Sequence, residues 1–313
     1  VIGNSVVIYV ISRDKNLKSK SSYHILSVAC ADLLIGLFGI PLGVTAGITG
    51  WPHDLHLCLL LNSFLLAVFA VSMFSLLAVS VDRCWAVCFP LTYHVKGPFI
   101  TKIIIAACWI FGIFFGFLPV LGWHSGKFVY KCDLRIVADF NYLLFICVAI
   151  AGLSALAIII LYAQIYRAIL KQAKRRQEMV ANTSEAMKQR REIKAAITLA
   201  LVVLTFLVLW TPGIICLFII AFTQNRDFPL DALQFATILV HLNAAIDPII
   251  YAYRMNNIRE QLKKVLKFYK RDAVSEGSSS GNDKSRSSRS VRTKSSITLV
   301  STLTLDTTMM AQT

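Results

Sequence analysis

The stretch HLNAAIDPIIYAYR, residues 241–254, places His241, Asn243 and Asp247 inside a segment that is otherwise apolar. Ionisable side chains at membrane depth are costly and are usually retained for function. Asn243 and Asp247 are one turn apart and share a helix face, whereas His241 is about 200° around the helix from Asn243 at ~100° per residue. The stretch therefore predicts a membrane-spanning helix that serves two different polar sites.

Apolar residues dominate the rest of the chain as well. They make up 56% of its 313 residues, more than the roughly 45–50% of soluble domains, and they gather in runs of about 20 residues with few charges. We therefore expect an all-α membrane protein, a bundle of seven transmembrane helices over residues 1–253. Because the chain begins at Val1 without an initiator methionine, we expect its short first helix to be truncated at the N-terminus. The expected spans are 1–12, 23–50, 58–82, 99–123, 139–168, 195–223 and 230–253.

Basic residues predict how the spans are oriented. The chain has 32 Lys and Arg against 17 Asp and Glu, and most of the basic residues fall in segments 13–20, 83–102 and 167–194 and after residue 254. Such segments stay on the cytoplasmic side, so we expect a multi-pass plasma-membrane protein with its N-terminus outside and its C-terminus cytoplasmic. Since the charge flanks apolar spans, it favours attraction to anionic membrane lipids over nucleic-acid binding.

The end of the chain differs from the spans. Residues 254–270 carry apolar positions at helical spacing between basic ones, which is typical of an amphipathic helix on the membrane surface. Residues 271–313 are rich in Ser and Thr and have no periodicity. We therefore expect a disordered cytoplasmic tail there, either a kinase substrate or a plain solvated segment.

Two of the eight cysteines, Cys58 and Cys132, fall on the predicted outer side of the membrane. The oxidising environment on that side permits a disulfide, which would join the loop at 124–138 to the third span. Two free thiols are the alternative.

Several polar residues lie deep in the predicted spans: Asp32, Ser72, Asn243 and Asp247. Two carboxylates in a medium of low dielectric cannot both stay ionised without a cation between them. Either one is protonated or a small ion is bound, and carboxylate, hydroxyl and amide oxygens suit a hard cation such as sodium. The alternative is a purely hydrogen-bonded network, and we expect no other cofactor.

The charged residues at the inner ends of two spans could form a switch. Asp82 and Arg83 end the third span, and Glu192 stands at the start of the sixth. A pair between Arg83 and Glu192 would hold the two helices together, and its opening would free their inner ends. The simpler interpretation of Arg83 is a lipid-facing flank residue.

Pro212 marks a second switch candidate in the sixth span. It removes a backbone hydrogen bond and predicts a kink. Phe206 and Trp210 are one turn apart on the same helix face, beside that kink. They could act as a lever, or they could be ordinary core packing.

A set of short motifs falls in the spans in a fixed order: GN (3–4), ACADLLIG (29–36), DR (82–83), FLVLWTP (206–212) and DPIIY (247–251). Together they resemble the rhodopsin-like (class A) G-protein-coupled receptors. The resemblance implies a receptor, not an enzyme, that binds an extracellular small molecule and activates a heterotrimeric G protein. Arrestin and a receptor kinase would be partners of the tail. The chain departs from the family at Ser154, which replaces the proline that accompanies the usual bulge in the fifth span.

The resemblance also implies roles for residues near the inner face. Tyr162 and Tyr251 would take part in the switch together with the residues already named. Arg83, Pro90 and Leu91 would contact the G protein.

Within this class, adenosine receptors are similar to the chain at residues 30–50, 72–83, 118–123 and 241–254. The likeness implies that His241 contacts the ribose side of a nucleoside and that Trp210 lies beneath it. Leu217, Leu134 and Arg135, however, stand where that subfamily holds the adenine. A non-purine apolar or lipid-like ligand is therefore the alternative to an adenosine-like one. The expected pocket residues are Leu65, Leu66, Phe69, Leu134, Trp210, Gly213, Leu217, Thr237 and His241.

An ion transporter is the remote alternative, in which Asp32, Asp247 and His241 line an ion path. Such a protein would be expected to show inverted repeats or helices broken by glycine-rich centres. The sequence shows neither of these features, so we favour the receptor.

Overall fold

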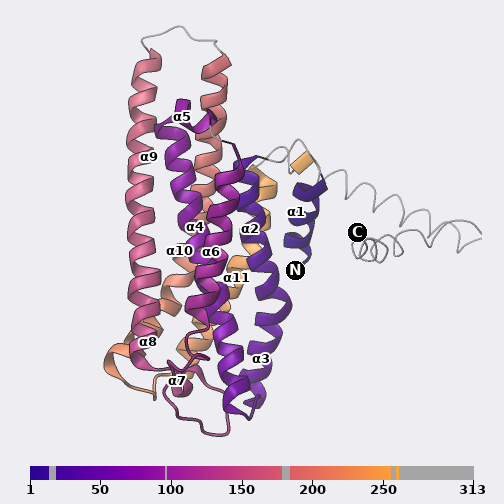
Figure 1. Ribbon diagram of the computed structural model, residues 1–313, viewed down its shortest axis with the longest axis vertical. Coiled ribbons are helices and arrows are strands. Elements are labelled where there is room, and N and C mark those ends of the chain that lie inside the picture. Colours follow the sequence, from indigo (N-terminus) through magenta and orange to yellow (C-terminus); the bar gives the residue numbers. More distant parts are fainter. Residues whose placement is uncertain (14–18, 96, 178–183, 255–258, 261–313) are drawn as a thin grey trace, which may run out of the picture. The chain divides into compact units, whose positions relative to one another are not determined.

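A computed structural model describes residues 1–13, 19–95, 97–177, 184–254 and 259–260, which consist of helices and connecting loops (Figure 1). Within those residues the β-structure is limited to isolated bridges. The predicted surface helix at 254–270 lies outside the described residues except at 254, 259 and 260, and the predicted tail at 271–313 lies outside them entirely.

The described residues form the expected bundle. Six helices, counted in this part of the chain, are long and apolar enough to cross a membrane, and α1 (Ile2–Arg13) is a shorter apolar one. The first long helix comprises α2 (Lys20–Leu34), the π-helix η2 (Ile35–Gly39) and α3 (Ile40–Thr49). The others are α4 (Leu55–Cys88), α6 (Phe99–Gly116), α8 (Phe140–Leu144) continued by the π-helix η3 (Phe145–Gly152) and α9 (Leu153–Gln177), α10 (Ser184–Thr223) and α11 (Leu230–Arg254). Short helices α5 (Pro90–Val95) and α7 (Leu134–Val137) lie in the loops.

Local sequence signals explain where α4 begins and ends. The carboxylate of Asp54 accepts a hydrogen bond from the backbone N–H of Leu57 at 2.9 Å and so caps the first turn. At the other end Phe89 leaves the helix, because the residue before a proline is disfavoured in the helical region. The 34-residue helix contacts α2, α6, α9 and α10.

Two glycines of α6 let it approach α4 closely. A Cβ atom at Gly112 would lie 2.5 Å from Val71 Cγ2, and one at Gly116 would lie 2.2 Å from the Cα atom of Ala67. Since such distances are far inside van der Waals contact, only glycine permits this seam. Small residues at helix contacts have the same use in other membrane bundles.

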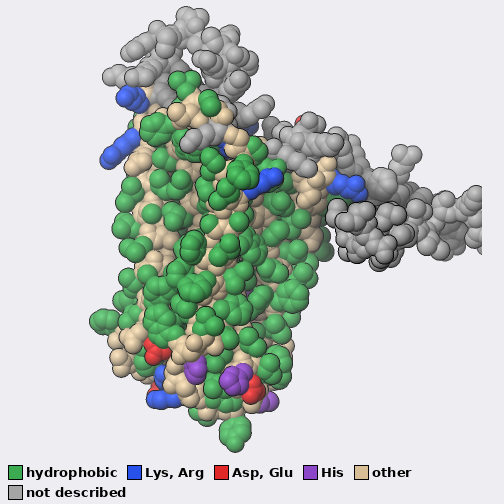
Figure 2. Space-filling model, in the orientation of Figure 1, with side chains coloured by type: hydrophobic (Ala, Val, Ile, Leu, Met, Phe, Trp, Pro, Cys, Tyr) green, Lys and Arg blue, Asp and Glu red, His purple; other side chains and the backbone are tan. Residues whose placement is uncertain are grey.

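Hydrophobic side chains cover the middle of the face shown in Figure 2, whereas charged and histidine side chains gather near its two ends. Ile110, Val208 and Ile249 are each more than 60% exposed. Apolar surface of this extent on long helices is what a bilayer covers.

The fifth span departs from a regular α-helix although it lacks the usual proline. The π-helix η3 covers Phe145–Gly152 and ends two residues before Ser154. A π-turn holds one more residue than an α-turn, so the bulge that the proline normally accompanies is present here without it.

Candidate functional site

The contact between α1 and α11 forms around Pro248. Proline has no N–H to donate to the carbonyl of Ala244, four residues earlier, and Asn4 Nδ2 donates to that carbonyl instead at 2.8 Å. A Cβ atom at Gly3 would lie 2.9 Å from Pro248 Cβ, so glycine makes room for the ring. The GN motif of the first helix is thereby explained by the proline of the last.

Next to this contact lie the polar residues of the expected ion site. Asp32 lies on α2 and Asp247 on α11, two helices that contact each other, and Asn243 is one turn from Asp247 on α11. Ser72 belongs to α4, which packs against α2. All four residues are at most 4% exposed.

Buried oxygens of these residues lack donors among the described residues. Asp32 Oδ2, Ser72 Oγ, Asn243 Oδ1 and Asp247 Oδ1 have no hydrogen-bond partner there, and neither does Asn4 Oδ1. Buried polar atoms are normally paired, and an oxygen-only cluster with two carboxyls is a donor set that fits a hard cation. The described residues hold no cluster of three or more His, Cys, Asp or Glu that could bind a metal ion, so a cation here would depend on the hydroxyl and amide oxygens as well.

Three aromatic rings join α4 to α10. The centroids of Phe69 and Trp210 are 4.6 Å apart at an interplanar angle of 27°, and those of Phe206 and Trp210 are 5.1 Å apart at 21°. Stacked pairs of this kind contribute about 0.5–1.5 kcal/mol beyond their burial. Tyr251 and Tyr162 border the same core, Tyr251 fully buried and Tyr162 partly. Phe206 and Trp210 are therefore part of the central packing, and their role as a lever stays a prediction.

At the end of the bundle that carries α5, Arg83 is fully buried and its guanidinium pairs with Asp82. Its Nε donates to Asp82 Oδ2 at 3.1 Å. A further donor is directed at the hydroxyl of Tyr93, 2.8 Å away, and that hydroxyl donates to Asp82 Oδ2 at 3.2 Å. The expected partner Glu192 has a side chain outside the described part of the structure.

Tyr93 was not identified from the sequence, although it follows Pro90 by only three residues. Its ring lies 3.9 Å from the ammonium of Lys20, and Lys20 also donates to the carbonyl of Tyr93 at 2.6 Å. Trp85 stands edge-on to the ring. These contacts hold α5 against the start of α2 and the end of α4.

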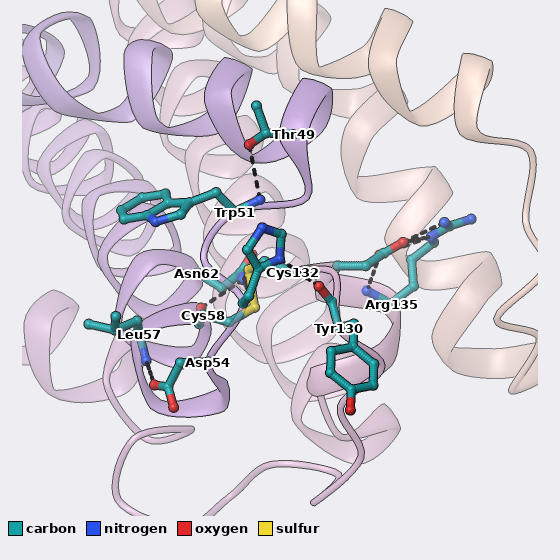
Figure 3. Close-up of a disulfide and its surroundings, with 11 residues drawn as sticks. Thr49, Trp51, Asp54, Leu57, Cys58, Asn62, Tyr130, Cys132 and Arg135 are labelled. Atoms are coloured by element: carbon teal, nitrogen blue, oxygen red, sulfur yellow. Dashed lines mark hydrogen bonds and ion pairs between the residues drawn. A yellow bond between two sulfur atoms is a disulfide. The ribbon is translucent and has the colours of Figure 1, made fainter.

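At the opposite end a disulfide joins Cys58 of α4 to Cys132, with Cα atoms 5.4 Å apart (Figure 3). The expected bridge is thus present. Asn62 donates to the carbonyl of Cys58 at 2.9 Å, and the backbone N–H of Cys132 donates to Gly50 at 2.9 Å. The loop after α6 is therefore fastened to the ends of both α3 and α4.

Comparison with known proteins agrees with this arrangement. The family of 7 transmembrane receptors (rhodopsin family) matches residues 3–251. The chain belongs to this family. It is also 30% identical to the adenosine receptor A2a of Homo sapiens over 85% of the chain and 69% of that receptor. It is 33% identical to the adenosine receptor A2b of Bos taurus over 86% of each protein.

As a class A G-protein-coupled receptor the protein is not an enzyme, and it spans the membrane several times. Its expected pocket residues fall into two groups. Leu66 and Phe69 are buried in the central core, and Leu134 and Trp210 pack against that same core. All four side chains therefore border the central core, and Phe69 and Trp210 contact each other; the pocket itself stays a prediction.

The remaining expected pocket residues lie in several different surroundings. A Cβ atom at Gly213 would lie 3.7 Å from Val240 Cγ2, so this glycine belongs to the contact between α10 and α11. Thr237 donates its hydroxyl to Leu233 of its own helix at 2.8 Å. Leu65 lies toward Gly39 of η2, and the side chains of Leu217 and His241 are half-buried.

The side chain of Arg135 takes part in a hydrogen-bond network that joins two loops. Its Nε donates to both carboxylate oxygens of Asp133 at 3.0 Å, and its Nη1 donates to the carbonyl of Phe228 at 2.7 Å. Hydrogen bonding to Asp133 raises the pKa of the guanidinium above its ordinary value. Arg226 in turn donates to the carbonyl of Ile136 at 2.6 Å and lies 4.3 Å from the ring of Phe140. The two arginines clamp the loop after Cys132 to the loop between α10 and α11.

Proposed function

We propose that this receptor binds a small extracellular molecule at the disulfide end of the bundle and activates a heterotrimeric G protein at the α5 end. The observation that carries the proposal is the stack of Phe69, Trp210 and Phe206. It begins among the expected pocket residues and reaches the core that holds Tyr251. A ligand that displaces Trp210 would therefore change packing deep in the bundle.

In this proposal the change in packing reaches Arg83, whose guanidinium donates hydrogen bonds to Asp82 and Tyr93. Release of Arg83 would let α5 and the inner ends of the long helices accept a G protein. Leu91 is 80% exposed beside Pro90, which supports both as contact residues. A pair between Arg83 and Glu192 would reinforce the closed arrangement.

The ligand is proposed on two grounds that point to different chemical classes. Relatives named adenosine receptors favour a nucleoside placed against His241. The apolar side chains of Leu66, Phe69, Leu134 and Leu217 favour a small, largely uncharged or lipid-like molecule instead. A site lacking the partners for a polar base loses roughly 10⁴-fold or more in discrimination, so the sequence alone weakens the purine assignment.

We propose that a sodium ion binds among the buried oxygens of Asp32, Ser72, Asn243 and Asp247 that have no hydrogen-bond partner within the described residues. The cation would balance the two carboxyls and supply the positive partner that each oxygen lacks. Because the ion would touch both α2 and α11, its binding would favour the arrangement in which these helices hold the two carboxyls together.

We also propose the topology expected from the basic residues. The disulfide end would face outward with the N-terminus, and α5, the surface helix at 254–270 and the tail at 271–313 would face the cytoplasm. Arrestin and a receptor kinase would act on the tail, and membrane lipids would contact the surface helix.

The ligand assignment is tested by measuring cyclic AMP and calcium in cells that express the receptor while nucleosides, amines and lipids are applied. A response to adenosine that is lost in His241→Ala supports the nucleoside assignment. A response to a lipid or another non-purine ligand, with silence toward adenosine, removes it. Failure of every response in cells where surface expression is verified would contradict the pocket proposal.

A further inference from the structure

A cavity lies against the aromatic stack of Phe206 and Trp210. It has a volume of about 140 Å³ and is lined by α4, the π-helix η3, α9 and α10. Phe206 and Trp210 both belong to its wall. Ala151, Gly152 and Ala155 also line it, and their small side chains leave the space open.

The residues that line this cavity range from buried to exposed. Met73 and Ala151 are each 1% exposed and form its deep end, while Ile215 is 51% exposed and Gly152 and Thr211 are exposed at its mouth. The cavity therefore runs from the outer surface of α9 and α10 inward to the stacked rings.

The lining has the chemistry of a hydrocarbon site. Its residues carry no charge, and the hydroxyl of Thr211 is satisfied by the carbonyl of Leu207 in its own helix. The indole N–H of Trp210 is buried and without a partner among the described residues, so one hydrogen-bond acceptor could be accommodated. An ionic or strongly polar molecule would lose its hydration there without compensation.

The opening of the cavity lies where a molecule could enter from the membrane. It lies within the spans Phe140–Lys171 and Ala196–Thr223, beside Leu156 and Val208, which are 54% and 61% exposed. At this depth the surroundings are lipid acyl chains. An apolar cavity of about 150 Å³ is large enough for a benzene-sized molecule, and the end of an acyl chain has a similar bulk.

We propose that the cavity takes the end of a hydrocarbon chain of a bilayer lipid, which packs against both Phe206 and Trp210. An occupant held there stabilises the stacked arrangement of the two rings. The lipid thus acts on the switch from the membrane, independently of any ligand near His241.

The experiment uses the full receptor in nanodiscs made with a phosphatidylcholine whose acyl chain ends in a diazirine. After illumination, mass spectrometry locates the labelled residues. Lipids around the bundle reach exposed residues such as Ile215 in any case, so labels on Met73 and Ala151, at the deep end, are the informative ones. The variant Ala155→Phe fills the cavity, and Leu156→Phe places the same phenyl ring at its outer, lipid-exposed neighbour.

We expect labels on Met73 and Ala151 in the unaltered receptor and in Leu156→Phe, and a loss of about tenfold in Ala155→Phe, since overfilling costs an occupant at least that much. Labels confined to exposed residues, or equal deep labelling in the filled variant, would overturn the proposal. Monodisperse elution verifies folding, and Ala155→Leu replaces the phenylalanine variant if that one does not fold. The readout needs neither agonist nor G protein, so its failure is separate from failure of the proposed function.

Discussion

The side chain of Asn4 donates to the carbonyl of Ala244 the hydrogen bond that the chain cannot supply from Pro248. We expect Asn4→Ala to lower the free energy of unfolding by about 1–3 kcal/mol, because a buried carbonyl then loses its donor. Thermal unfolding of the purified receptor measures the loss. Ser5→Ala is the matched control, since Ser5 is the exposed neighbour on α1, and an equal loss in both variants would contradict the assignment.

Tyr93→Phe tests the closed arrangement of Arg83. The variant keeps the ring against Lys20 but removes the hydroxyl that lies between Arg83 and Asp82. Hydrogen bonds to charged groups contribute about 1.5–3 kcal/mol, so basal nucleotide exchange on a G protein should rise about tenfold. Tyr9→Phe changes an exposed tyrosine and should leave exchange as it was. Unchanged exchange in Tyr93→Phe would remove this residue from the switch.

Sodium binding predicts a salt-specific stabilisation. Replacing choline chloride by sodium chloride at constant ionic strength should raise the melting temperature, because a ligand that binds only the folded state stabilises it. Asp32→Asn should abolish the difference, whereas Asp231→Asn, at an exposed position of α11, should preserve it. A sodium effect that survives in Asp32→Asn would place the ion elsewhere.

The clamp formed by Arg135 should persist to high pH. Its pKa is raised above the ordinary value by Asp133, so its stabilisation is complete below the pKa of an unfolded arginine and is lost only as the pH rises through the raised pKa of the folded state. Arg135→Lys carries an ordinary pKa of about 10.4 and should lose stability earlier. Melting temperatures of both proteins from pH 7 to pH 11 give the comparison. Parallel curves would mean that the side-chain charge does not contribute.

The close contact between α4 and α6 predicts that alanine lowers the free energy of unfolding at Gly116, whereas alanine at Gly47, outside that contact, raises it. Gly116→Ala forces a methyl group onto the backbone of Ala67 and should destabilise the receptor by about 1–3 kcal/mol. Gly47→Ala in α3 meets nothing within 4 Å and should stabilise it by up to about 1 kcal/mol, because alanine favours the helix. Thermal unfolding compares the two, and equal effects would show that the seam tolerates the extra methyl.

The helices were predictable because each span repeats the same signal, a long apolar run between charged segments. Residues 99–123 show the limit of that signal, since α6 ends at Gly116 although the apolar run continues to Trp123. Hydropathy reports burial or lipid contact, and it does not distinguish a helix from an apolar turn.

The site was less predictable because its contacts cross the bundle. Asp32 and Asp247 could be singled out in advance, because an ionisable side chain at membrane depth is costly wherever it lies. Tyr93 could not, because its role depends on how α5 packs against Lys20 and Arg83. Gly213 was predicted to line a pocket, and its position against Val240 is decided by the packing of α10 on α11.

The π-helix at Phe145–Gly152 lets this segment absorb a change of chain length. A π-turn holds one more residue than an α-turn, so deleting one residue there would convert the wide turn to an ordinary one and leave Phe140–Leu144 facing as before relative to α9. Tyr142, buried with its hydroxyl 3.2 Å from the carbonyl of Phe115, would keep that partner. The same deletion in the regular helix α9 would instead turn the outer half by about 100°, so the position of a deletion decides whether this helix is redirected.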